Sequence, residues 1–113
     1  MSKYILVCGS KDYENHKLIY EVLDDHLQIF PDHIILIGDS SGADFIAREY
    51  ALDYNISFKK IKGTDSSRDS EMIKLNPSIV LAFSSKSYLT SGIINIVTQA
   101  KHMNITVKEY LSE

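Results

Sequence analysis

Short, unbroken apolar runs rich in β-branched residues alternate along this chain with stretches whose apolar residues recur every three or four positions. Such runs are typical of strands buried on both faces of a sheet, and the periodic stretches are typical of amphipathic helices. The pattern predicts strands over residues 4–8, 34–37, 56–61, 78–83 and 105–107. It predicts helices around residues 18–27, 45–54, 72–75 and 93–103.

Strands that alternate with helices favour a mostly parallel sheet with right-handed crossovers. We therefore predict an α/β fold with a five-stranded parallel sheet in the order 3-2-1-4-5 and helices on both faces. The third strand is amphipathic and ends in lysines, so it is expected at an edge, with the fifth strand at the other. Residues 63–70 are polar without a period and are expected to form a loop. The 113 residues are expected to form one domain over residues 1–113.

The composition excludes several classes of protein. A net charge of −3 gives no broad basic surface for duplex nucleic acid. The single cysteine, Cys8, rules out an internal disulfide and is expected to be a small buried hydrophobe. The histidines share no metal-ligand spacing, so we expect no metal, and we expect no cofactor. No apolar run approaches the roughly 18 residues of a membrane span, so we expect a cytoplasmic protein with no membrane partner.

Three loops stand where an open parallel sheet binds its ligand, beyond the carboxyl ends of the strands. They cover residues 9–15, 38–44 and 84–92, and each places glycine beside hydroxyl residues before a helix. Their backbone N–H groups would converge on one crevice, which favours phosphate binding. Ordinary strand-to-helix turns and helix caps use the same residue types. The candidate ligand-binding residues in these loops are Gly9, Ser10, Lys11, Gly38, Asp39, Ser40, Ser41, Gly42, Asp44, Ser84, Ser91 and Gly92.

Several of these residues have two interpretations. Gly38 suits a tight turn, and Gly42 permits a close backbone approach. Asp39 could contact a ribose hydroxyl or pair with Lys11. Asp12 could contact the ligand, but capping of the first helix is favoured. Tyr13 and Tyr88 are the tyrosines best placed to stack on a base, although tyrosines more often pack a helix against a sheet. The residues alone assign no catalytic group.

A set of short motifs resembles one known family in order and spacing. The motifs are Val7-Cys8-Gly9-Ser10-Lys11-Asp12-Tyr13, Gly38 with Gly42-Ala43-Asp44, Arg68-Asp69-Ser70-Glu71-Met72, Ala82-Phe83, Gly92, and Ala100 before Ile105-Thr106-Val107. From about Lys3 to Glu109, the chain resembles the small YspA-type, cpYpsA-related branch of the SLOG superfamily. These Rossmann-like domains are related to the cytokinin-activating LOG enzymes and to DNA-processing protein A. The resemblance implies that Arg68 contacts the ligand, where the alternative is a solvated loop charge.

The chain also departs from the pattern of that branch. Asp39 and Ser41 stand where members usually have a glycine and an arginine, and Lys11 stands for an arginine. Ile93 follows Gly92 where a threonine is usual. LOG enzymes carry a glutamate in the first turns of the last helix, and this chain has no acid there. Cleavage of an N-glycosidic bond needs a carboxylate, so this absence argues against LOG-type phosphoribohydrolase activity.

The sequence therefore favours a cytoplasmic binding module for a nucleotide or nucleotide-derived small molecule. The alternative is a nucleotide or nucleoside N-glycosidase or ribosyltransferase, with Asp39, Asp44 or Asp12 as the acid and Arg68 orienting the phosphate. The family resemblance also suggests a homo-oligomer.

Overall fold

The five predicted strands form one parallel sheet. The computed structural model describes residues 3–39, 41–63, 65–85 and 91–112. The elements in chain order are β1 (Tyr4–Gly9), α1 (His16–Ile29), β2 (Ile34–Ile37), α2 (Ala43–Asp53), β3 (Phe58–Lys60), α3 (Asp65–Lys74), β4 (Ile79–Ser85), α4 (Ser91–His102) and β5 (Thr106–Ser112). All pairings are parallel, and the order β3-β2-β1-β4-β5 confirms the predicted order.

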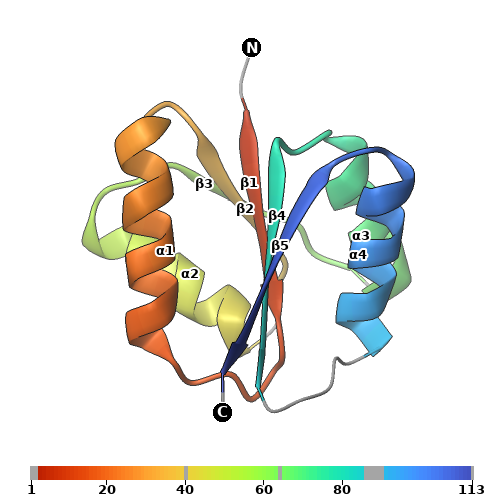
Figure 1. Ribbon diagram of the computed structural model, residues 1–113, viewed down its shortest axis with the longest axis horizontal. Coiled ribbons are helices and arrows are strands. Elements are labelled where there is room, and N and C mark those ends of the chain that lie inside the picture. Colours follow the sequence, from red (N-terminus) through yellow and green to blue (C-terminus); the bar gives the residue numbers. More distant parts are fainter. Residues whose placement is uncertain (1–2, 40, 64, 86–90, 113) are drawn as a thin grey trace.

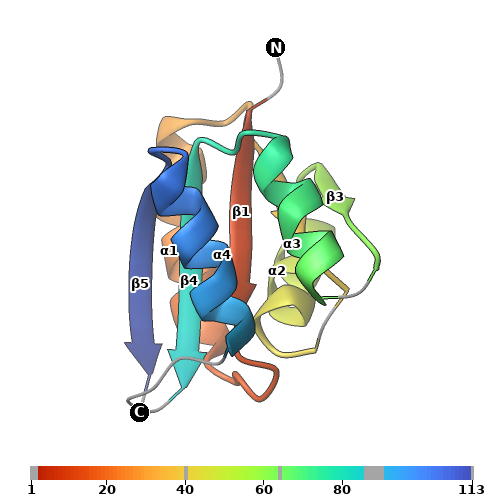
Figure 2. The same cartoon turned by 90° about the vertical axis from the view of Figure 1, so that its right-hand side faces the viewer.

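The helices form a layer on each face of the sheet. Helices α1 and α2 cover one face, and α3 and α4 cover the other (Figure 1). The strands all point toward the lower end of the molecule, where the loop after β1 and the starts of α2 and α4 also lie (Figure 2). This end contains the carboxyl ends of β1, β2 and β4, from which the three predicted loops begin (Figure 1).

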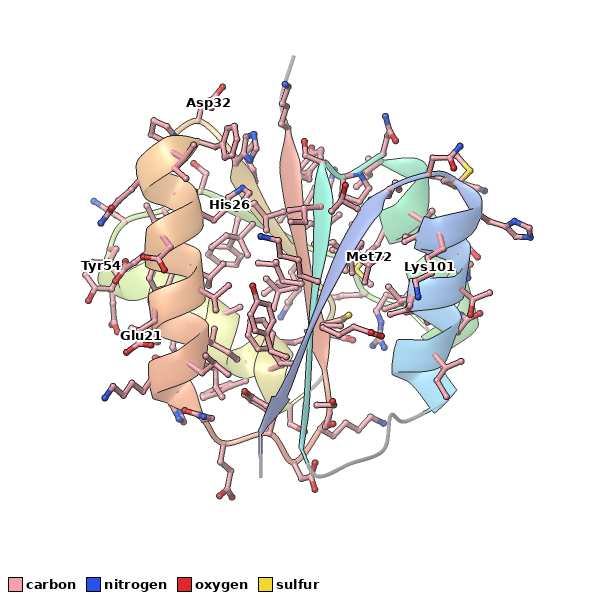
Figure 3. The ribbon with its side chains drawn as sticks, viewed as in Figure 1. Glu21, His26, Asp32, Tyr54, Met72 and Lys101 are labelled. Carbon is pink, nitrogen blue, oxygen red and sulfur yellow. The ribbon has the colours of Figure 1, made fainter. Side chains whose placement is uncertain are left out.

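Alternation along β1 divides the core in two. Ile5 and Val7 pack in the cluster on the α1 and α2 side, whereas Leu6 and Cys8 pack in the cluster on the α3 and α4 side. Met72 of α3 lies between the second helix layer and the sheet (Figure 3). Because both faces of β1 are covered, its apolar run has no polar alternation.

Three boundaries differ from the predictions. Residues 65–70 are helical and not a loop, because α3 begins at Asp65; the polar sequence of this segment gives no apolar period that would predict a helix. Strand β5 runs to Ser112, because β4 supplies parallel partners along its whole length. Strand β3 is shorter than predicted, at three residues, but it lies at the edge as expected.

The first helix is capped by a different residue from the one favoured by the sequence. Asn15 is the N-cap of α1, and its Oδ1 accepts a hydrogen bond from the backbone N–H of Leu18 over 3.1 Å. The helix begins later than Asp12 would allow, so the capping prediction for Asp12 is wrong. In the part of the chain that the structure describes, no helix is long and apolar enough to cross a membrane.

Candidate functional site

Arg68 joins residues from several elements at the carboxyl edge of the sheet. Its Nη1 lies 3.0 Å from Oδ1 of Asp39, the residue that follows Gly38 at the end of β2. Its Nε lies 3.9 Å from Oδ1 of Asp69 on the same helix. The Arg68 side chain is only 11% exposed, so it is not the solvated loop charge that the sequence left as an alternative. We call Asp39, Asp44, Arg68, Asp69 and Asn95 the Arg68 cluster.

Gly38 makes room for this cluster. A Cβ atom at Gly38 would lie 2.9 Å from Cδ and from Nε of Arg68, and 2.9 Å from Oδ2 of Asp44. These distances are too short for ordinary contacts, so any side chain at position 38 would displace one of the two groups. Gly38 therefore brings Arg68 from α3 and Asp44 from the first turn of α2 to the same point after β2.

Asp69 and Asn95 also lie at the candidate site, although neither is predicted from the sequence as a ligand-binding residue. The Asn95 side-chain amide donates a hydrogen bond to Oδ2 of Asp69 over 3.0 Å. Asp69 is 1% exposed, and a buried carboxyl group needs such partners because desolvation is costly. The sequence contains one indication that Asp69 could be a site residue: it directly follows Arg68 in the motif Arg68-Asp69-Ser70-Glu71-Met72. Asn95 lies in the first turns of α4, where LOG enzymes have a glutamate.

The space beside Gly42 is occupied by the backbone of Ser10 and Lys11. Its φ of 74° is one that residues with a side chain rarely adopt, and a Cβ atom at this position would overlap the carbonyl oxygen of Ser10. Ser41 Oγ donates to the carbonyl oxygen of Lys11 over 3.0 Å, and Ala43 N–H donates to that of Ser10 over 3.4 Å. The close approach that Gly42 permits therefore joins the loop after β1 to the start of α2.

The remaining residues of the first loop have structural contacts too. A Cβ at Gly9 would overlap the carbonyl oxygen of Phe83 and the Cβ of Ala43. Ser10 is buried, and its N–H donates to the carbonyl oxygen of Phe83 over 3.0 Å. Tyr13 is buried against Phe83, with ring centroids 5.7 Å apart, which is the packing alternative for this tyrosine. Lys11 is exposed, and Asp39 pairs with Arg68 where the sequence had suggested Lys11 as a partner.

The last loop is described only in part. Ser84 is a buried residue of β4. Ser91 and Gly92 begin α4, and only their backbone is described. Ser40 and Tyr88 lie outside the described residues, so their predicted roles stay predictions.

The thiol of Cys8 is buried, which disfavours its reactive thiolate form. Burial raises the pKa of the Cys8 thiol, and the carboxyl groups of Asp44, Asp69 and Glu109 raise it further. Among the described residues, no group of three or more histidine, cysteine, aspartate or glutamate side chains is arranged to hold a metal ion. His26 contacts His33, and His26 lies in the half of the molecule nearer the amino ends of the strands (Figure 3).

The parallel sheet, its two helix layers and the polar cluster at its carboxyl edge define a Rossmann-like α/β domain. The model of the YspA, cpYpsA-related SLOG family matches residues 4–62, and the chain belongs to this family. No curated protein matches the chain. The matched segment contains Gly38, Asp39 and Asp44, whereas Arg68 and Asn95 lie beyond it. Family and fold together point to a nucleotide-related function.

Proposed function

We propose that this protein binds a nucleotide or nucleotide-derived ligand at the carboxyl ends of β1, β2 and β4. The observation that supports the proposal best is the convergence of Asp39 from the β2–α2 loop and Asp44 from α2 on Arg68. Asn95 of α4 extends this cluster through its hydrogen bond to Asp69, the neighbour of Arg68. Charged and amide side chains gathered at the carboxyl edge of an open parallel sheet are typical of a ligand site. The SLOG family assignment favours a nucleotide as the source of that ligand.

Different parts of this edge suit different parts of a nucleotide. The start of α4 presents backbone N–H groups at the positive end of a helix dipole, which suits a phosphate near residues 91–92. The phosphate position expected near residues 40–42 is less suitable, because the backbone of Ser10 and Lys11 lies against Gly42 and the Ala43 N–H donates to Ser10. Asp39 and Arg68 offer one acceptor and one donor group beside each other, which suits the hydroxyls of a ribose or the polar edge of a base.

A thermal-shift screen of nucleosides and nucleotides tests the proposal. A ligand at 100 times its Kd should add about 2.7 kcal/mol to the free energy of unfolding. We expect Arg68→Met to show a smaller shift than the wild type, each measured against its own unliganded melting temperature. Arg48→Met is the matched control, because Arg48 lies on the body of α2. A screen in which no nucleoside or nucleotide shifts the wild-type melting temperature contradicts the proposal.

One observation favours a second candidate function, hydrolysis at an N-glycosidic bond. Asp69 is a buried carboxyl group hydrogen-bonded to Asn95 of α4, the helix that lacks the LOG-type acid. In such a reaction water would add to C1′ as the bond to the base nitrogen breaks, and the water proton would pass through the carboxylate to the departing base. We expect weak or no release of free base from nucleoside monophosphates. Release that Asp69→Asn abolishes would favour the enzyme over the binding module.

Two broader expectations also remain proposals. The protein is proposed to act in the cytoplasm, and it is proposed to form a homo-oligomer. Light scattering coupled to size-exclusion chromatography tests the oligomer directly, and a monomer over the working concentration range would contradict it.

A further inference from the structure

The ion pair between Asp39 and Arg68 determines which charge the candidate site can accept. The Asp39 side chain is 37% exposed and the Arg68 side chain is 11% exposed, so a ligand would reach Asp39 more readily than Arg68. A carboxylate that pairs with a guanidinium occupies the donors that would otherwise bind a phosphate. Asp39 therefore stands where a phosphate would have to bind in order to contact Nη1 of Arg68.

The neighbouring groups strengthen this effect. Asp44 lies against Gly38 beside Arg68, and Asp69 lies 3.9 Å from Nε of Arg68. The Arg68 cluster thus contains three carboxyl groups and one guanidinium. Like charges that are brought close together repel strongly when they are partly buried. A phosphate monoester, with close to two negative charges at neutral pH, would be opposed here unless it displaced Asp39.

An uncharged hydrogen-bond donor would not be repelled by these carboxyl groups. A carboxylate is an acceptor with several lone-pair sites, and one contact with Arg68 leaves acceptor capacity on Asp39. A ribose hydroxyl that donates to Asp39 adds no charge to the cluster. It also leaves the ion pair with Arg68 in place.

We propose that Asp39 is a specificity-determining residue that, by pairing with Arg68, makes this part of the site select an uncharged, hydroxyl-bearing portion of the ligand over a phosphate monoester. The inference rests on the proposed function, because it concerns how that site discriminates between ligands. Removing the Asp39 charge would release Arg68, and Arg68 would then contact phosphate. The effect of Asp39 on phosphate binding therefore requires Arg68.

Matched ligand pairs test this inference. Titration calorimetry would give Kd values for adenosine, guanosine, cytidine and uridine and for their 5′-monophosphates. We expect Asp39→Asn to change the ratio of the two affinities by about tenfold in favour of the monophosphate, because a hydrogen bond to a charged group is gained. Asp32→Asn is the control, since Asp32 is exposed in the turn before β2 and its replacement makes the same change in net charge.

A second variant identifies the group responsible. In the double variant Asp39→Asn with Arg68→Met, the gain in monophosphate affinity should disappear. The inference is overturned if Asp39→Asn leaves the ratio unchanged, if Asp32→Asn changes it equally, or if the gain persists without Arg68. In these cases ligands still bind and the proposed function stands. If no ligand binds the wild type or any folded variant, the proposed function itself fails, and the inference fails with it.

Discussion

The side-chain amide of Asn95 donates to the carboxyl group of Asp69 over 3.0 Å, and this hydrogen bond joins helices α3 and α4 beside the candidate site. Asp69 is almost fully buried. Its carboxyl group therefore needs hydrogen-bond partners such as Asn95 to offset the cost of burial between the two helices. The bond also links two polar residues that lie 26 positions apart in the sequence.

Replacing Asn95 tests the contribution of this bond. Asn95→Leu keeps the side-chain size and removes the donor, so a buried acceptor loses a partner. We expect the free energy of unfolding to fall by about 1–3 kcal/mol, measured by urea denaturation. Gln99→Leu, on the same helix, is the control and should cost much less. A double-mutant cycle with Asp69→Asn should give a coupling energy above about 0.5 kcal/mol. Equal losses for Asn95→Leu and Gln99→Leu would show that the bond contributes little.

Gly42 and Gly63 allow a second, paired prediction. Both have positive φ angles, 74° and 138°, so alanine is strained at either position. A Cβ at Gly42 would overlap the Ser10 carbonyl oxygen, whereas at Gly63 its nearest contact is 3.9 Å away, at Cβ of Arg68. We expect Gly63→Ala to cost about 1–3 kcal/mol and Gly42→Ala to cost more, by about a further 1–3 kcal/mol of overpacking. Chemical denaturation of both variants measures the difference, and equal costs would mean that the loop after β1 moves aside freely.

Cys8 provides a probe of opening at the core. Because burial and three nearby carboxyl groups raise the pKa of its thiol, the reactive thiolate is scarce in the folded protein. We expect a thiol reagent to label Cys8 slowly in native buffer and rapidly in urea, at a rate that follows global unfolding. Rapid labelling under native conditions would show that the sheet opens locally at β1.

Most of the fold could be predicted because the strands carry strong local signals. The apolar run of β1 has no polar residue that could face solvent, and the short β3 ends in lysines, so the central and edge positions follow from the residues themselves. The predicted start of helix α3 lies too far along the sequence, because the residues of its first turns are polar. In α3 the polar residues Arg68 and Asp69 are followed by the buried apolar residues Met72 and Ile73, so an apolar helical period is present only in its second half.

The candidate site could be predicted only as a region of the chain. The loops after β1 and β2 lie at the carboxyl edge as expected, but Gly42 contacts the chain's own backbone. The pairing of Asp39 with Arg68 depends on the packing of α3 against Gly38. A sequence does not show which of several charged residues will meet when they come from different loops. Asp69 was missed for the same reason.

A histidine pair gives the protein a predicted dependence on pH. Nε2 of His26 lies 2.9 Å from Nδ1 of His33, and the ring of Phe30 stacks on His33 with centroids 4.8 Å apart. Burial lowers the pKa of His26 below its usual value, and the proximity of His33 and Lys108 lowers it further. The folded state therefore favours neutral His26 and the hydrogen bond between the two rings.

The sign of the effect follows from proton linkage. Below a pH of about 6.5, the ordinary pKa of histidine, His26 binds a proton more readily in the unfolded chain than in the folded one. The free energy of unfolding should therefore decrease as the pH falls from about 6.5 toward the lower pKa of the folded state, and the loss is complete below it. His26→Gln keeps a side-chain donor for His33 but does not titrate, so it should flatten this part of the curve relative to wild type. His102→Gln, an exposed position at the end of α4, should leave the slope unchanged. Urea denaturation at intervals between pH 5 and 7.5 gives the three curves, and parallel curves for the wild type and His26→Gln would contradict the prediction.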